Sequence, residues 1–594
     1  PCSGGPDGRR ACKDPDGGLG IVAPEKKWSI QQPDSDLVNS LSRSCGCDSI
    51  LASLLINRGI RDPQKALAFL NPSLSDISSP FLMKDMTKAV ERIARALAEK
   101  ERILIFGDYD VDGVTGTTLL LEFLSNAEAD VTYYIPDRFR EGYGLNKDYI
   151  LSNAVAANIR LIITVDCGIN SVEAVDAANH HDMDVIVTDH HETPEQLPDA
   201  VAILNPKQAE CTFPCPMLAG VGVAFYLVLA LRKHLRDKGF WAGRTEPNLK
   251  SVCDLVALGT VADIVPIKSE NRILVKTGLD VLTTGIRPGV NALKEVSGPL
   301  KTELDTWDIA FKLAPRINAA GRLSQARAAV ELLAAPDKST ALPAAHFLNK
   351  TNRERQQIEK AILDEVMRFL GANPGHLKLR SIVLAGNGWN EGVIGIVASK
   401  LLDLYFRPVV LISVGNGRAK GSARSIPGFN IHEGLKDCAR YLDTFGGHKA
   451  AAGLSLLPEN IPAFASRFER VVRGKSQAQD FVRKIVIDRM VRFEEINVGL
   501  MNQIGRMPPF GQGNPEPLFA AENVRIVRHG IVGKKHVRMN LAQHGCFRQG
   551  LPAIWYNGAS RQPLPDEFRK IAFHMRWNLW RNRKTLQLVI KEAE

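Results

Sequence analysis

Three carboxylates at alternate positions, Asp108, Asp110 and Asp112, come directly after an apolar run at residues 103–106. Carboxylates this close raise one another's pKa unless a cation neutralises them. Hard divalent cations prefer oxygen ligands, and carboxylates above all. The arrangement therefore predicts a metal site at the end of a strand.

Three later segments place possible ligands after apolar stretches in the same way. They are Asp166 after residues 161–165, the group Asp189, His190 and His191 after residues 185–188, and Asp263 at the end of residues 259–263. In an open parallel sheet the carboxyl ends of the strands line one crevice, so these groups can converge there. Asp and His without Cys suit Mn²⁺ or Mg²⁺ better than structural zinc, and they exceed what one ion can use, so we expect two ions.

Two such ions, about 3.5–4 Å apart, activate a bridging water and hold both oxygens of an in-line phosphoryl displacement. We therefore predict hydrolysis of a phosphate ester. One alternative is that the aspartates only cap the helices that follow them. Another is that the glycine-rich residues 107–116 cradle a phosphate, but they lack the Lys-Ser/Thr pair of a P-loop and their carboxylates would repel a bare phosphate.

The elements that must position these groups alternate between strand-like and helical runs over residues 101–300, which predicts a doubly wound, mostly parallel α/β sheet. Strands are expected at 103–106, 131–135, 161–165, 185–188 and 201–204, with helices from Thr115 and Ser171. A second α/β unit begins near residue 381, and short β runs after residue 476 suggest a small barrel or sandwich. The expected organisation is a disordered tail (1–27), a helical region (28–100) with amphipathic runs at 49–55 and 89–98, the α/β domain with the metal site (101–300), a linker with a long helix (301–375), a second α/β domain (376–475) and a β-barrel (476–594).

The net charge of +10 is concentrated in the last segment of the chain. Residues 521–594 hold 14 Lys/Arg against 5 Asp/Glu, which leaves 61 against 60 from the totals of 75 and 65. Aromatic residues lie among these charges, namely Trp555, Tyr556, Phe573, Trp577 and Trp580. Basic groups with stackable rings indicate a surface for single-stranded nucleic acid. The alternative is a small β-domain whose aromatic rings all lie in its core.

The ten cysteines are scattered without paired zinc-site spacing, so reduced thiols are expected rather than zinc ligands or disulfides. No apolar run approaches the roughly 20 residues that span a bilayer, and no secretory signal opens the chain. These patterns predict a cytoplasmic protein without membrane contact. The length of 594 residues exceeds one hydrophobic core and requires several domains.

The four acidic and histidine segments resemble the successive motifs of the DHH phosphoesterase superfamily. Further segments resemble its RecJ exonuclease family, in the order DHH domain, linker helix, DHHA1 domain and OB-type domain. These segments are residues 315–322, 352–356, 446–448 and 509–517. The resemblance covers the chain from about residue 28 to its end.

The resemblance implies 5′-to-3′ degradation of single-stranded DNA to mononucleotides with Mn²⁺ or Mg²⁺, in DNA repair and recombination. Carried over by motif, the expected metal ligands are Asp110, Asp112, Asp166, His190 and Asp263. Asp108, Asp189 and His191 would be further ligands or would orient the ligands. We also expect a monomer, with single-strand-binding protein and a helicase as possible partners.

A terminal phosphate is best recognised by guanidinium groups and small hydroxyl donors. The alternate positions 418, 420, 422 and 424 would share one face of a strand. The expected DNA and 5′-phosphate contacts are Arg418, Lys420, Ser422 and Arg424, to which the resemblance adds Arg138 and Arg316. His448, beside two glycines, is a candidate contact to the scissile phosphate. The alternatives are a plain surface charge for Arg424 and a core histidine for His448.

Two other functions stay open. The metal site could act on short oligonucleotides, cyclic dinucleotides or pyrophosphate, as other DHH proteins do, but these substrates would not need the basic final segment. A catalytically silent DNA-binding scaffold is the other, and the presence of every expected ligand argues against it.

Overall fold

The computed structural model describes residues 26–594 except 324–325, 416, 547–549 and 581–582. The chain forms two compact units. The first unit comprises Asn39–Arg353 and Asn502–Glu516, and the second comprises residues 1–38, Glu354–Met501 and Pro517–Glu594. A disordered tail was expected at residues 1–27. Residues 1–25 lie outside the described residues, and residues 26 and 27 belong to a strand.

The first unit contains a five-stranded sheet in the order β3-β2-β4-β5-β6, and all its strands are parallel. The strands are β2 (Ile103–Gly107), β3 (Val131–Tyr134), β4 (Leu161–Val165), β5 (Asp184–Thr188) and β6 (Ala202–Leu204). The predicted parallel sheet is therefore confirmed. The chain goes from β2 to β3 on one side and then to β4 on the other, so a crevice forms at the carboxyl ends of β2 and β4.

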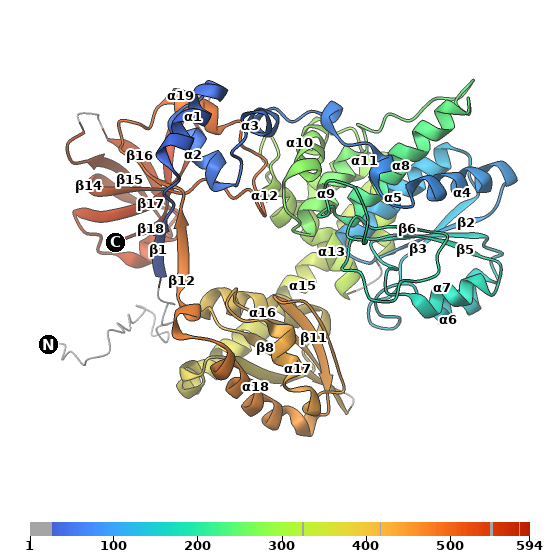
Figure 1. The fold of residues 1–594 in the computed structure, drawn as a ribbon. Coiled ribbons are helices and arrows are strands. Elements are labelled where there is room, and N and C mark those ends of the chain that lie inside the picture. The colour runs from blue at the N-terminus through green and yellow to red at the C-terminus, as the bar shows by residue number, and fades with distance from the viewer. Residues whose placement is uncertain (1–25, 324–325, 416, 547–549, 581–582) are drawn as a thin grey trace. The chain divides into compact units, whose positions relative to one another are not determined.

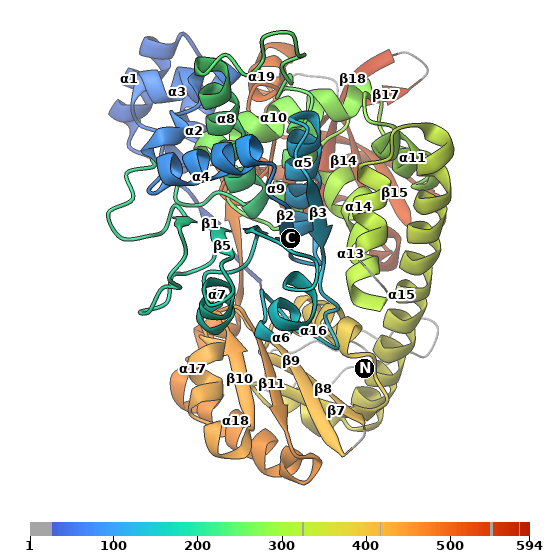
Figure 2. The ribbon, with the colours of Figure 1, turned by 90° about the vertical axis from the view of Figure 1, so that its right-hand side faces the viewer.

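Helices cover both faces of this sheet (Figure 2). One face packs against α4 (Met86–Glu99), α5 (Val111–Asn126), α8 (Gly220–Asp237) and α9 (Cys253–Ala262), and the other against α6 (Lys147–Tyr149) and α7 (Val172–Asn179). Ile103 and Ile105 of β2 point to the first face, and Leu104 and Phe106 to the second. Because both faces are buried, the strands are continuously apolar rather than alternating.

The remaining helices of the first unit surround this core. They are α2 (Ser49–Asn57), α3 (Pro63–Leu70), α10 (Ser269–Thr284), α11 (Pro288–Val296), α12 (Thr306–Asp308), α13 (Ala314–Leu323) and α14 (Arg327–Leu333). Helix α1 (Ser35–Cys45) and the long helix α15 (Lys338–Ala372) each contribute residues to both units. The long helix that was expected within residues 301–375 is therefore present as α15.

Three local expectations were wrong. The helix after β2 begins at Val111 rather than Thr115, because the Asp110 carboxylate caps it by accepting hydrogen bonds from the amides of Asp112 (2.8 Å) and Gly113 (3.2 Å). Helix α2 is not amphipathic, since it is buried at every position from 50 to 56. Residues near position 28 form a strand rather than a helix.

In the second unit, a mixed sheet has the order β10-β11-β9-β8-β7, which can be followed in Figure 2; Figure 1 labels its strands β8 and β11. Its strands are β7 (Ile382–Asn387), β8 (Val409–Gly415), β9 (Arg418–Arg424), β10 (Thr444–Gly447) and β11 (Ala451–Leu456). Only β7 and β8 are parallel to each other among the pairs of this sheet. Its helices are α16 (Glu391–Tyr405), α17 (Ile431–Lys436) and α18 (Ile461–Lys475), and α17 and α18 share a core with β8, β9 and β11.

The C-terminal strands close a five-stranded barrel, which confirms the prediction of a small barrel. They are β14 (Phe519–Val532), β15 (His536–Gln543), β16 (Leu551–Trp555), β17 (Glu567–Trp580) and β18 (Arg583–Ala593). The pairing of β14 with β17 closes the ring. Strand β1 (Lys26–Ile30) pairs with β12 (Arg483–Ile487), and the short elements β13 (Arg489–Met490) and α19 (Val498–Ile504) precede the barrel.

Within the described ranges, none of the helices combines the length and apolar character needed to cross a membrane.

Candidate metal centre

The acidic and histidine segments converge at the carboxyl ends of the strands in the first unit. Their ligand atoms form three overlapping groups, each within 4.8 Å: Asp108, Asp110 and Asp166; Asp112, His190 and Asp263; and Asp166, His190 and His191. The loops after β2, β4 and β5, the first turn of α5 and the C-terminal end of α9 supply these residues. The convergence predicted from the sequence is therefore observed.

His190 lies at the middle of the cluster. Its Nε2 is 3.0 Å from Asp166 Oδ1, 3.6 Å from Asp263 Oδ2 and 3.8 Å from Asp112 Oδ2. Burial, followed by the neighbouring His191, lowers the pKa of His190 to about 3, so its imidazole is neutral. A neutral imidazole among carboxylates is the form that binds a metal ion.

Three buried polar atoms in the cluster make no hydrogen bond to any residue that the structure describes. They are Asp108 Oδ1, Asp166 Oδ1 and His190 Nε2. Buried polar atoms without partners are unfavourable and uncommon in native proteins. Their position among five carboxylates fits a set of ligand atoms for Mn²⁺ or Mg²⁺.

Four carboxyl groups of this centre have raised pKa values. Burial and, after it, the neighbouring Asp110 raise the pKa of Asp112 to about 7, and burial and then Asp112 raise that of Asp263 to about 9. Burial and adjacent carboxylates also raise the pKa values of Asp108 and Asp166. Divalent cations would restore the ionised forms, as the sequence predicts for clustered carboxylates.

Asp112 is fixed by the beginning of helix α8. Its Oδ2 accepts a hydrogen bond from the amide of Gly220 (2.6 Å), and its Oδ1 accepts one from the amide of Val221 (2.8 Å). Asp110 caps α5, as described above. Helix capping, which was the alternative to metal binding, therefore occurs at both residues, but it does not satisfy Asp108, Asp166 or His190.

Asp189 belongs to none of the three groups and instead orients its neighbours. It accepts hydrogen bonds from the amides of Ile169 (3.0 Å), His190 (2.7 Å) and His191 (3.0 Å), and its Oδ1 lies 2.7 Å from His191 Nδ1. Burial alone would raise the pKa of Asp189, but the hydrogen bonds with His191 outweigh it and lower the pKa. An ionised Asp189 therefore holds the histidine pair in place.

The predicted phosphate-binding strand is β9 in the second unit. Ala419 and Ala423 are buried, whereas the residues at 418, 420, 422 and 424 lie on the other face, as expected. Lys420 forms an ion pair with Glu391 at the start of α16 (3.0 Å). The Arg424 guanidinium is half-buried and donates to Ser422 Oγ (3.1 Å), so it is not a plain surface charge.

A Cβ atom at Gly395 of α16 would lie 2.8 Å from Ser422 Oγ and 2.9 Å from Arg424 Nη2. The glycine therefore lets the first turns of α16 approach this pair closely. Backbone amides at a helix start, a hydroxyl and a guanidinium together suit a phosphate. His448 follows β10 and is exposed, which contradicts the alternative of a core histidine.

The two other expected phosphate contacts lie in the first unit. Arg138 is exposed, and its guanidinium carbon is 5.1 Å from the centroid of the Tyr109 ring. Arg316 of α13 is half-buried and donates from Nε to Asn349 Oδ1 (3.0 Å). Their role in binding DNA stays a prediction.

The expectation about the barrel aromatics was correct only in part. Trp555 and Phe573 are buried and serve the core. Tyr556 is 52% exposed, and Trp577 is half-buried with Lys584 Nζ 4.7 Å from its ring centroid. The side chain of Trp580 lies outside the described residues. Of the five aromatic residues, Tyr556 and Trp577 are therefore the ones whose described rings are not buried.

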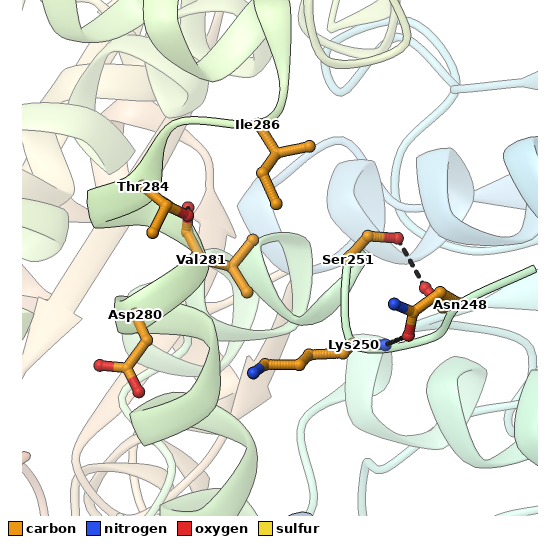
Figure 3. Close-up of a pocket in the computed structure, with 7 residues that line it drawn as sticks. All are labelled: Asn248, Lys250, Ser251, Asp280, Val281, Thr284 and Ile286. Atoms are coloured by element: carbon orange, nitrogen blue, oxygen red, sulfur yellow. Dashed lines mark hydrogen bonds between the residues drawn. The ribbon is translucent and has the colours of Figure 1, made fainter.

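A pocket of about 260 Å³ lies away from the carboxylate cluster, between the 248–251 turn and the end of α10 (Figure 3). Asn248, by its side-chain and backbone oxygens, accepts hydrogen bonds from Lys250 N (3.1 Å) and Ser251 Oγ (2.6 Å). Asp280 is its one acidic lining residue, so the pocket offers no comparable ligand set.

The sequence analysis missed two residues that contact the centre. Asn318 Oδ1 accepts from the amide of Val111 at the start of α5 (3.2 Å), and the Tyr143 hydroxyl lies 3.0 Å from His191 Nδ1. In the sequence, the flanking glycines Gly142 and Gly144 could have drawn attention to Tyr143. In the structure both glycines have positive φ. Neither residue belongs to a pattern of metal ligands.

The eight described cysteines are all free, and none belongs to a group that could hold a metal. For the described part of the chain, this agrees with the expectation of reduced thiols.

A doubly wound parallel sheet with an Asp/His cluster at its carboxyl edge defines a phosphoesterase of the DHH class. Three family models match the chain: "DHH family, N-terminal domain" at residues 102–260, "DHHA1 domain" at 378–474 and "RecJ OB domain" at 487–592.

Relatives with the name single-stranded-DNA-specific exonuclease RecJ match nearly the whole chain. The Bacillus subtilis protein is 39% identical over 96% of this chain and 71% of its own length. The Escherichia coli protein is 35% identical over 91% of this chain and 95% of its own. The structure of Thermus thermophilus RecJ with Mn²⁺ superposes with a TM-score of 0.81 at 27% identity, covering 96% of this chain and 80% of that one. The chain belongs to the RecJ family.

Proposed function

We propose that this protein is a metal-dependent exonuclease that hydrolyses single-stranded DNA from the 5′ end to mononucleotides. The observation that carries this proposal is the convergence of the Asp/His ligand groups at one edge of the sheet. The RecJ relatives, which are named as single-stranded-DNA-specific exonucleases, support the substrate. The basic barrel supports a long single strand over a small phosphate ester.

The residues of the centre have two different roles. Some would bind the cations directly, and others orient the residues that bind them. Mn²⁺ or Mg²⁺ would be held by Asp108, Asp110, Asp112, Asp166, His190 and Asp263. When bound, such a pair of ions lowers the pKa of water and neutralises charge that develops on the phosphate. The Gly220 and Val221 amides orient Asp112, and Asp189 orients His191.

The second unit would bind the phosphates of the strand. Arg418, Lys420, Ser422 and Arg424 on β9 are the proposed 5′-phosphate contacts, with Arg138 and Arg316 of the first unit, and exposed His448 is the proposed contact to the scissile phosphate. A site for a terminal phosphate explains a preference for 5′ ends. Roles in repair and recombination, single-strand-binding protein and a helicase as partners, the monomeric state, the cytoplasmic location and the domain limits stay predictions.

Digestion of end-labelled single-stranded and duplex DNA tests this function, with Mn²⁺, Mg²⁺ or chelator present and the label at either end. We expect metal-dependent release of 5′-terminal mononucleotides from single strands only. Release from duplex or from the 3′ end would contradict the substrate or the polarity.

The variant Asp110→Asn tests the centre, because an amide oxygen keeps an acceptor for capping α5 but removes the charge. We expect normal strand binding with at least a hundredfold loss of cleavage. Asp280→Asn, an exposed aspartate of the same unit outside the centre, is the matched control and should cleave normally. Unchanged cleavage by Asp110→Asn would remove the assignment.

A further inference from the structure

The loop between β3 and α6 brings a tyrosine to the rim of the metal centre. Glu141 holds this loop by accepting hydrogen bonds from the Tyr134 hydroxyl (2.8 Å) and the Asp137 amide (2.7 Å). Gly142 and Gly144 have φ values of +83° and +85°, a conformation that glycine adopts without strain. These two glycines therefore let the backbone turn on both sides of Tyr143.

The Tyr143 hydroxyl contacts two segments that carry metal-centre residues. It donates a hydrogen bond to the carbonyl oxygen of Asp166 (2.8 Å) and lies 3.0 Å from His191 Nδ1. The tyrosine and histidine rings meet edge to face, with centroids 5.6 Å apart. Asp166 itself has φ +61°, which is uncommon for a residue with a side chain, so its carbonyl points away from the ordinary strand direction.

These contacts define which nitrogen of His191 carries a proton. Asp189 Oδ1 lies 2.7 Å from His191 Nδ1, and an ionised carboxylate can only accept. The Nδ1 atom must therefore be protonated, and the tyrosine oxygen, whose own proton goes to Asp166, is a second acceptor for it.

We propose that Tyr143 is a positioning residue that fixes the direction of the His191 ring through its contact with Nδ1. Nε2 is then the nitrogen that His191 offers to a cation or to the substrate phosphate. This inference rests on the proposed function. It predicts an effect on turnover rather than on strand binding, because the hydroxyl acts through His191.

Tyr143→Phe keeps the ring and removes the hydroxyl. We expect kcat on a single-stranded oligonucleotide to fall about tenfold with KM and thermal stability nearly unchanged. Phe139→Ala, which truncates another exposed ring of the same loop, is the control and should keep kcat within twofold. In a His191→Ala background, Tyr143→Phe should cause no further loss, because the residue through which it acts is gone.

An equal loss of kcat in both backgrounds, or no loss in either, would overturn the proposal. Histidine ¹⁵N spectra of the full chain give a second measurement that needs no turnover, with the His191 signals assigned by His191→Gln. We expect the His191 Nδ1 signal to shift in Tyr143→Phe, because this nitrogen loses one of its two side-chain hydrogen-bond partners. Identical spectra would refute the positioning role even if the native protein did not cleave DNA, whereas an inactive native protein with the expected spectra would refute only the proposed function.

Discussion

Gly220→Ala adds one methyl group next to a metal-centre residue. Gly220 is the first residue of α8, and a Cβ atom there would lie 2.7 Å from both Cβ and Oδ1 of Asp166. Ordinary Cβ contacts begin near 3.4 Å, so Asp166 or the helix start must move by about 0.7 Å. Metal–ligand distances tolerate shifts of roughly 0.2 Å. The substitution should therefore impair cation binding.

Gly220→Ala has two opposing effects on the free energy of unfolding. Crowding of this kind costs about 1–3 kcal/mol, and alanine in place of glycine in a helix returns up to about 1 kcal/mol. The protein should stay folded, with a loss of about 0–3 kcal/mol in the free energy of unfolding. The concentration of Mn²⁺ that gives half-maximal cleavage should rise roughly 10–100-fold, as for other changes that displace metal ligands.

The assay is a Mn²⁺ titration of nucleotide release from single-stranded DNA, with denaturation in chelator as the measure of folding. Gly222→Ala in the same helix is the matched control, because the atoms nearest its new Cβ would belong to the Leu218 side chain, at an ordinary 3.4 Å or more. We expect native metal dependence for Gly222→Ala. If Gly220→Ala keeps the native metal dependence within twofold, the argument from the Asp166 contact is wrong.

Three further predictions follow from other parts of the structure. Tyr556→Ala should weaken binding of single-stranded DNA about tenfold in a fluorescence titration, because stacking is lost while the barrel stays folded. Trp555→Ala should instead destabilise the barrel by about 3–5 kcal/mol, because the Trp555 side chain is buried. Equal behaviour of the two variants would contradict the exposed position of Tyr556 and the buried position of Trp555. Because burial raises the pKa values of Asp112 and Asp263 to about 7 and 9, above their unfolded values near 4, the metal-free folded state binds more protons than the unfolded state between these limits. The free energy of unfolding of the metal-free protein should therefore fall as the pH rises from about 5 to 9, which urea denaturation measures. Mn²⁺ should bind more tightly at the higher pH, which calorimetry measures. A metal-free stability that rises with pH would refute the raised pKa values of these carboxyl groups. Asn514→Ala should destabilise the first unit by about 2–4 kcal/mol in urea denaturation, because this fully buried amide donates to the carbonyl oxygens of residues 507 and 509 and accepts from residue 58; a change below about 0.5 kcal/mol would contradict that role.

The sequence alone predicted the sheet and the convergence of the acidic and histidine segments at its edge. The apolar runs that end in Asp166 and in the Asp189–His191 group are local features, and a doubly wound sheet places all strand ends at one edge. The alternation on β9 could be predicted for the same reason, since side chains alternate along any strand.

Contacts between residues distant in sequence were decided only by the tertiary structure. The amides at the start of α8 donate hydrogen bonds to Asp112, although about a hundred residues separate the two segments. No sequence pattern in either segment predicts this contact. The same holds for the Tyr143 hydroxyl at His191 and for strand β1, which was expected to be helical and pairs with β12. The burial of Trp555 beside exposed Tyr556 likewise depends on the closure of the barrel. Local periodicity fixes which face a side chain takes within its own element, but the partners of that face depend on how the elements pack, which local sequence does not encode.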